Sequence, residues 1–227
     1  MIKKTRFNVS LRLVLICPFV ILVLMLTTTI IFLSYCTGKK ATTELSDKLL
    51  RETTERIVQA VDRHIVGSGA ALEATFPNGM RVSPDIRTEL ESLRSRFWIA
   101  TSLHTNPNNY VYYGNQAGQA FGVFRFPGNE GELRIKLKPE ENRARYRFTG
   151  IDGELRFDSM ESKLFDPRER PWYIAGKTST TDTWTSVYID FGTPELLATR
   201  ARRVLGADGK VEGVVATDMS LKRLNDF

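Results

Sequence analysis

An uncharged run near the N-terminus constrains this chain more than any other feature. From Leu13 to Tyr35 no side chain carries a charge, and most are apolar. A helix rises about 1.5 Å per residue, so about 20 such residues cross the roughly 30 Å of hydrocarbon in a bilayer. Pro18 stands near the start of the run, where its missing backbone N–H costs least. The run therefore predicts one membrane-spanning helix over residues 13–35.

Basic residues before this run predict its orientation; they are Lys3, Lys4, Arg6 and Arg12. Because Lys and Arg favour the cytoplasmic side, we expect residues 1–12 in the cytoplasm and the residues after the run on the extracytoplasmic side of the membrane. A cleaved signal peptide would have a shorter apolar core and a small-residue exit site. Cys36 ends a segment similar to a lipoprotein cleavage box, but Tyr35 is bulky where a small residue is needed. A cysteine at the membrane interface is therefore preferred over a lipidated one.

Composition narrows the class of the remaining chain. Of 227 residues, 42% are hydrophobic and 26% are charged, which is typical of a folded protein rather than a disordered one. The net charge of +6 is spread over the N-terminus and two later arginine clusters, so nucleic acid is not an expected partner. The two cysteines, Cys17 and Cys36, belong to the apolar run and its end, so no disulfide is expected in the outer domain.

A second helix is predicted over Ala41–Val66, where apolar and charged residues recur at helical spacing without Pro or Gly. Residues 36–66 would form a stalk that continues the membrane helix, and we expect a homodimer through it. The Gly-Ser-Gly segment at 67–69 is predicted to relax the helix. After a loop marked by Pro and Gly, a short helix is predicted around Asp85–Trp98.

Beyond Asn109 the pattern changes to period-two alternation between glycine-containing turns, which predicts β-strands. The Gly-Ala-Asp-Gly segment at 206–209 is a hairpin signal between the last two of them. The fold class is therefore α+β, with an antiparallel sheet in residues 67–227 packed against the long helix. The strand candidates are Val111–Tyr113, Phe121–Phe126, Leu133–Leu137, Arg145–Phe148, Leu155–Asp158, Leu196–Leu205 and Val211–Met219.

The densest group of chemically active side chains occupies Phe165–Gly176 and Trp184–Asp190. An Asp-Pro-Arg lead-in precedes Arg-Pro-Trp-Tyr there, and Gly-Val-Val-Ala-Thr-Asp-Met-Ser-Leu follows at 213–221. This combination resembles the double Cache sensor domains found outside the membrane in bacterial chemoreceptors, sensor kinases and cyclic-dinucleotide enzymes. The resemblance implies a PAS-like sheet in the membrane-distal lobe. It also implies that a full receptor continues past Phe227 into a membrane-proximal lobe, another membrane helix and a cytoplasmic output domain.

A subset of that family binds amino acids, and its binding pattern falls on residues of this chain. The resemblance implies that Arg170 clamps a carboxylate with Trp172 and Tyr173 as neighbouring donors, and this suits the planar fork of a guanidinium. It implies that an ammonium group is received by Asp218 and Asp190 with the hydroxyl of Tyr188. The leading tyrosine of the pattern is replaced by Phe165, which removes one hydroxyl.

Structural roles are the alternative for several of these residues. Trp172, Tyr173 and Trp184 would then be core aromatics, Asp190 would cap a turn, and Asp218 would cap a following helix. Arginines 143, 145 and 147, and likewise 200 and 202, share strand faces. We expect these faces to be solvated, with an acidic partner or anionic lipid headgroups as the alternative.

No catalytic fingerprint occurs in the sequence, so a binding module is expected rather than an enzyme. His64 and His104 lack further ligands nearby, and no metal or cofactor is expected. The predicted function is sensing of a small molecule, an amino acid or a related amine-bearing carboxylate, whose binding shifts the stalk helix. The alternatives are a ligand-free module that pairs receptor subunits and a sensor for a different small organic acid.

Overall fold

The computed structural model describes residues 11–103 and 109–224, and these divide into two units. One unit ends at Glu55 and the other begins at Arg56, within the predicted stalk. Helix α1 (Leu11–Thr75) has residues in both, and it is long and apolar enough to cross a membrane. The lysines and arginine at positions 3, 4 and 6, and His104, lie outside the described residues.

Helix α1 continues to Thr75, so the predicted break at residues 67–69 is wrong. Gly69 lies against the guanidinium of Arg200, where an added Cβ would come within 3.0 Å of Nη1. The same Nη1 donates to the carbonyl oxygen of Ile65 at 2.7 Å and to Ser68 Oγ at 3.2 Å. The glycine therefore allows close packing between α1 and a strand, and this tertiary contact outweighs its low helix propensity.

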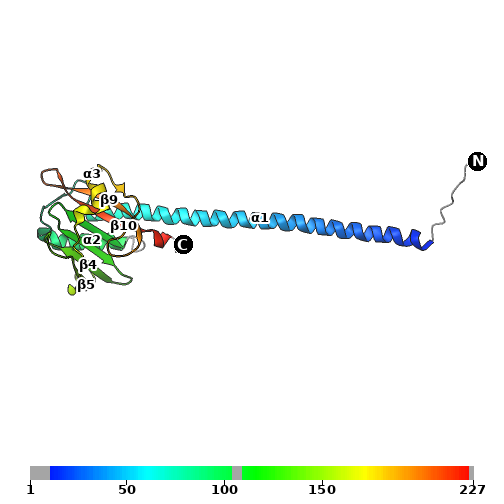
Figure 1. The fold of residues 1–227 in the computed structure, drawn as a ribbon, viewed down its shortest axis with the longest axis horizontal. Helices are drawn as coiled ribbons and strands as arrows, with labels where there is room; N and C mark the ends of the chain where they lie inside the picture. Colours follow the sequence, from blue (N-terminus) through cyan, green and yellow to red (C-terminus); the bar gives the residue numbers. More distant parts are fainter. Residues whose placement is uncertain (1–10, 104–108, 225–227) are drawn as a thin grey trace, which may run out of the picture. The chain divides into compact units, whose positions relative to one another are not determined.

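The described part of the second unit contains ten strands in one sheet (Figure 1). The strand order is β1-β9-β10-β2-β3-β4-β5-β6, and β7 and β8 also pair with β9. The seven predicted strands each overlap one of these, which confirms the α+β class; β1, however, runs parallel to β9, against the expected antiparallel pattern. The bounds are β1 Arg81–Val82, β2 Tyr110–Asn115, β3 Ala120–Arg125, β4 Glu130–Lys136, β5 Ala144–Thr149, β6 Arg156–Met160, β7 Thr183–Trp184, β8 Tyr188–Ile189, β9 Leu196–Gly206 and β10 Val211–Ser220.

Short helices connect these strands. The helix predicted around Asp85–Trp98 is present as a 3₁₀ turn followed by a longer α-helix, and it begins where Asp85 accepts a hydrogen bond from the backbone N–H of Arg87. The bounds are η1 Ile86–Glu89, α2 Leu90–Leu103, η2 Pro167–Glu169, α3 Pro171–Thr178 and α4 Leu221–Leu224.

The two faces of the sheet carry separate apolar clusters, because side chains alternate along each strand. The face that we call the helix face includes Val111, Tyr113 and Val215, and the end of α1 and α2 pack on it. The other, which we call the cavity face, includes Tyr112 and Val214, and α3 packs there across β9 and β10 (Figure 1). The sheet is thus covered on both sides.

The part of α1 that packs on the sheet lies later than predicted. Residues 41–59 are exposed, and burial begins at Ala60 and recurs at His64, Ala71 and Leu72. These positions share one side of the helix. The prediction that Ala41–Val66 packs on the sheet is therefore wrong for residues 41–59, because they are exposed. The buried side of α1 begins at Ala60 and continues beyond Val66 to the end of the helix at Thr75.

The five arginines expected on solvated strand faces are ion-paired instead. Arg143 is 6% exposed and makes a two-pronged ion pair with Glu161, with N–O distances of 3.0 and 2.8 Å. Arg200 and Arg202 both bind the carboxylate of Asp182. Their partners are distant in sequence, and the folded chain brings them alongside the strands. Arg147 is the most exposed of them, at 46% of its side chain, but its Nη2 also lies 3.2 Å from Glu132 Oε2.

Candidate functional site

Strand register brings several functional side chains together on the cavity face. Residues that are paired directly across antiparallel strands point to the same face. One row across the sheet joins Ala216, Tyr112, Gly122 and Arg134. The next row pairs Asp218 with Thr199 and Tyr110 with Phe124.

Gly122 makes room for the aromatic floor of this region. A Cβ at that position would come within 2.9 Å of Tyr112 Cβ and 3.0 Å of the Tyr110 hydroxyl. The rings of Tyr110 and Tyr112 lie 4.7 Å apart between centroids. Because Gly122 has no side chain, both tyrosines can lie close to the backbone of β3.

A cavity of about 30 Å³ opens on the cavity face. Tyr110, Arg134, Asp190 and Asp218 also line a hollow of about 270 Å³, so the two spaces adjoin. Of the seven residues singled out in the sequence, six line the cavity: Phe165, Arg170, Trp172, Tyr188, Asp190 and Asp218.

Asp218 is held by hydroxyl groups that approach one of its oxygens. Thr199 donates to Oδ1 at 2.6 Å, Tyr112 donates to the same atom, and the hydroxyl of Tyr188 lies 2.7 Å from Thr199 Oγ1. Within the described ranges no hydrogen bond reaches Oδ2. Burial raises the pKa of Asp218 to about 6, although the two hydroxyl donors act to lower it. The carboxylate is thus mostly ionised at pH 7 and keeps one oxygen open.

Arg170 stands at the start of α3, where Pro171 occupies the first helical position. Proline suits that position because its missing N–H would have no partner in the helix. The Arg170 side chain takes no part in capping, and its guanidinium carbon lies 5.0 Å from the centre of the Phe191 ring. This contact is a cation–π interaction, which orients the guanidinium without neutralising it.

The other arginines that line the cavity already have carboxylate partners. Arg134 Nε lies 2.6 Å from Glu132 Oε1, and Arg143 Nη2 lies 2.8 Å from Glu161 Oε1. Arg170 forms no ion pair in the part of the chain that the structure describes. Its positive charge is therefore the one available to an anionic group in the cavity.

Aromatic rings form the walls. Phe165 packs edge-on against Phe191 at 5.3 Å, and Trp172 packs edge-on against Tyr112 at 4.9 Å, both between ring centroids. The buried ammonium of Lys136 donates to the Phe165 carbonyl oxygen at 2.6 Å and fixes the backbone there. Apolar walls of this kind lower the local dielectric constant around the charged groups, which strengthens their electrostatic interactions.

Tyr173 and Asp190 lie differently from what the family pattern implies. Tyr173 is 2% exposed in the apolar cluster under α3, does not line the cavity, and has a pKa raised to about 12 by burial. Asp190 lines the cavity, but its Oδ2 accepts from the backbone N–H groups of Gly192 and Thr193 at 3.0 and 2.9 Å. That is the turn-capping role given as the alternative for Asp190.

Sequence reasoning missed three residues around Asp218. Tyr112 and Thr199 donate to its carboxylate, and Arg134 lines the cavity beside it. Tyr112 lies in the predicted strand Val111–Tyr113 and Tyr110 directly before it, and this two-residue spacing was a signal for one shared face. Thr199 and Arg134 carry no local signal, because only strand register brings them here. In the described ranges no group of three or more His, Cys, Asp or Glu residues is arranged to hold a metal ion.

No family model matches the chain. The chain is similar to the ligand-binding domain of the Pseudomonas fluorescens chemoreceptor CtaA in complex with L-alanine, at 23% identity over 79% of this chain and 62% of that one, with a TM-score of 0.44. It is also similar to the ligand-binding domain of the Pseudomonas aeruginosa PAO1 amino acid chemoreceptor PctC in complex with GABA. The identity is 18% over 78% of this chain and 60% of that one, with a TM-score of 0.44. A third similar structure is the ligand-binding domain of the Campylobacter jejuni chemoreceptor Tlp3 in complex with 4-methylisoleucine. The identity is 16% over 79% of this chain and 54% of that one, with a TM-score of 0.42. The chain thus spans less than two thirds of the length of each of these structures.

Proposed function

We propose that this chain is the ligand-sensing lobe of a membrane-anchored bacterial receptor of the Cache type, and that its cavity binds an amino acid or a related amine-bearing carboxylate. One observation carries the proposal: an arginine with no carboxylate partner among the described residues and a carboxylate with an open oxygen line the same cavity. A zwitterion satisfies both. Arg170 would take the ligand carboxylate with two parallel N–H donors, and Asp218 would take the ammonium.

Charge balance favours a zwitterion over a simple anion. A ligand that carries only a carboxylate compensates Arg170 but leaves Asp218 desolvated and ionised. A ligand that carries only an amine leaves the reverse imbalance. Arg134 and Arg143 are already held by Glu132 and Glu161, so neither is as free to take the ligand as Arg170. This distinguishes the proposed ligand from the plain organic acid that the sequence left as an alternative.

The size of the cavity bears on how a ligand acts. One water molecule needs a cavity volume of about 10–15 Å³, so a cavity of about 30 Å³ holds about two water molecules. A whole amino acid therefore requires the adjoining hollow or an outward shift of the segment around Phe191. A ligand that fits only one of two arrangements shifts the population toward that arrangement.

Strand β9 supports a route from the cavity to α1. Thr199 donates a hydrogen bond to Asp218 on the cavity face. The adjacent Arg200 donates one to the carbonyl oxygen of Ile65 in α1 on the helix face. A shift of β9 around an occupied cavity would therefore reach α1. Since α1 also contains the predicted spanning segment, it is the element we propose to carry the signal.

Membrane orientation and pairing are further parts of the proposal. The basic residues before the apolar run favour a cytoplasmic N-terminus and an extracytoplasmic sensing lobe. Several apolar side chains of α1 beyond the apolar run are exposed, among them Leu50 and Ile57, which are one heptad apart. This exposure favours pairing with a second copy through the stalk helix.

Calorimetry on the full chain in a neutral detergent, with a panel of amino acids, GABA and simple organic acids, tests the ligand class. Arg170→Ala and Asp218→Ala should each weaken the best ligand at least tenfold, because a charged group left without its partner costs about 2–5 kcal/mol. Arg170→Lys should also weaken it, since an ammonium lacks the planar fork. Arg156→Ala, a change at an exposed arginine on β6, is the matched control.

The same titration separates the alternatives. Unchanged affinity in both alanine variants would reject this site even if a ligand binds elsewhere. No binding across the panel, together with a dimer in solution, would favour the ligand-free pairing module. Phe165→Tyr restores the hydroxyl of the family pattern, and tighter amino-acid binding in that variant would support the proposed ligand class.

A further inference from the structure

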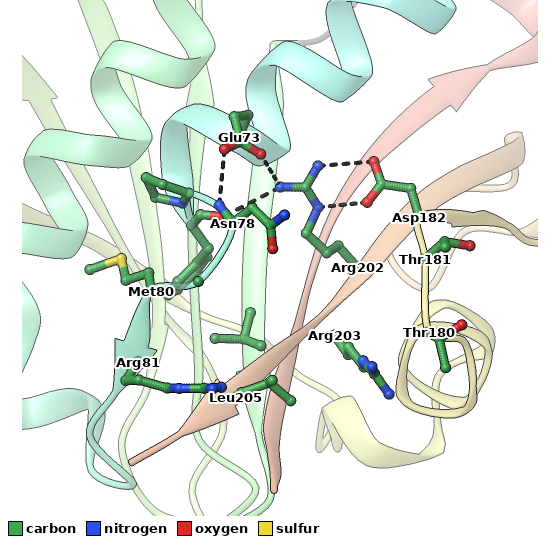
Figure 2. Close-up of a pocket in the computed structure, with 14 residues that line it drawn as sticks. Glu73, Asn78, Met80, Arg81, Thr180, Thr181, Asp182, Arg202, Arg203 and Leu205 are labelled. Carbon is green, nitrogen blue, oxygen red and sulfur yellow. Dashed lines mark hydrogen bonds and ion pairs between the residues drawn. The ribbon is translucent and has the colours of Figure 1, made fainter. Parts of the chain in front are cut away.

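A second cavity, of about 450 Å³, lies among the end of α1, strand β1, strand β9 and the segment before β7 (Figure 2). None of its lining residues lines the cavity at Asp218 or the adjoining hollow. Its volume is within the range of small-molecule sites, which is about 300–1,000 Å³. It is therefore a separate space with its own chemistry.

One side of this cavity is a closed network of paired charges. Arg202 Nη2 lies 3.1 Å from Asp182 Oδ2, and its Nη1 binds Glu73. Arg200 Nη2 lies 3.0 Å from the same oxygen of Asp182. Burial acts to raise the pKa of Asp182, but the two arginines outweigh it and the pKa is lowered. Figure 2 shows Glu73 and Asp182 on either side of the Arg202 guanidinium.

Two further arginines line the cavity outside this network. Arg81 pairs with Leu205 in the parallel β1–β9 ladder, and Arg203 is two residues before Leu205. Side chains two residues apart on a strand point to the same face, so Arg81 and Arg203 are diagonal neighbours there. In the described ranges neither forms an ion pair or a side-chain hydrogen bond, and Figure 2 draws both without a partner.

The charges of the lining do not balance without an anion. The lining holds three arginines and two carboxylates, and both carboxylates are already engaged by Arg202. The neighbouring positive charges of Arg81 and Arg203 repel each other across a strand pair. An anion between them would remove that repulsion, and the side chains of Asn78, Thr180 and Thr181 in the same lining offer uncharged donors.

We propose that this second cavity binds a compact dianion, a phosphate or a small dicarboxylate, through Arg81 and Arg203. Guanidinium groups present paired N–H donors that match the oxygens of both kinds of anion. The cavity has no free carboxylate for an ammonium group, so it selects against the zwitterion proposed for the cavity at Asp218. An anion bound here would tie the two-residue strand β1 to β9, close to the end of α1.

The test uses the full chain in a neutral detergent, titrated by calorimetry with inorganic phosphate and, separately, with succinate at constant ionic strength. At least one anion should bind saturably. Arg81→Gln and Arg203→Gln should each weaken it at least tenfold, and thermal unfolding should show that both variants remain folded. Comparing phosphate with succinate identifies which kind of anion the geometry prefers.

A control variant removes the same charge elsewhere. Arg156→Gln lies on β6, at the other end of the strand order from β1. It should leave anion binding unchanged. The proposal is overturned if neither anion binds saturably, or if the control loses as much affinity as the cavity variants. Since the amino-acid titration depends on Arg170 and Asp218, failure of one proposal is distinguishable from failure of the other.

Discussion

The two sides of strand β9 use charged side chains in opposite ways. On the helix face, Arg200 and Arg202 share the carboxylate of Asp182 and bond the backbone of α1 or the loop after it. On the cavity face, Arg170 and Asp218 line one cavity, and in the described ranges neither forms an ion pair. The first arrangement joins a helix to a sheet. The second keeps two opposite charges partly buried and apart.

This contrast gives a way to distinguish structural from functional charges in the chain. Breaking a buried pair by removing one partner is strongly destabilising, because the other charge stays desolvated. Removing a charge that has no partner costs little stability and can even be favourable. Paired and unpaired arginines should therefore respond differently to the same substitution.

Loss of the Arg143 ion pair should cost the most stability. Arg143→Ala should lower the free energy of unfolding by about 3 kcal/mol, because it leaves the carboxylate of Glu161 buried with only Arg145 at 3.1 Å. Arg170→Ala should change it by less than about 0.5 kcal/mol. Thermal and urea unfolding of both variants in a neutral detergent measure the difference. Equal losses would mean that Arg170 has a structural partner and would weaken the comparison.

The second effect is the pH dependence of ligand affinity. Because burial raises the pKa of Asp218 to about 6, the free site takes up a proton as the pH falls below that value. A ligand ammonium needs the ionised form and must displace this proton. Affinity should be constant above about pH 7 and fall about tenfold per pH unit below about pH 6.

Asp218→Asn provides the control for this pH profile. The variant should bind weakly at every pH and lose the dependence near pH 6. Its thermal stability at pH 7 should equal or exceed that of the parent chain, because the carboxylate is desolvated when ionised, whereas the amide is neutral. A parent profile that is flat between pH 5 and pH 7 would argue against contact between Asp218 and the ligand.

The smallest effect tests the helix face. Gly69→Ala should destabilise the chain by about 1 kcal/mol, although alanine favours a helix by a similar amount. The added Cβ meets the guanidinium of Arg200, which is held by its bonds to Ile65 and Ser68 and its ion pair with Asp182. In an Arg200→Ala background the same substitution should become stabilising, which a double-mutant cycle measures. The same sign in both backgrounds would remove the packing role of Gly69.

Elements with local signals could be predicted from the amino-acid sequence. An uncharged run predicts the apolar segment of α1, period-two alternation predicts the seven longer strands, and Gly-Ala-Asp-Gly predicts the turn between β9 and β10. These features depend on residues within one element, so no long-range contact was needed to recognise them. The motif around Arg170 likewise pointed to residues that the structure brings to one cavity.

The way these elements meet could not be predicted, because it depends on contacts between residues remote in sequence. Strand register brings Tyr112 from β2 and Thr199 from β9 to Asp218. Tyr112 is 106 residues from Asp218 along the chain, and Thr199 is 19 residues from it. The contact with Arg200 lets α1 run through Gly69, against the local helix-breaking signal. Burial, ion pairing and register all depend on residues remote in sequence. For that physical reason the sequence indicated which side chains carry chemistry, and the fold decided which of them are paired and which are left open.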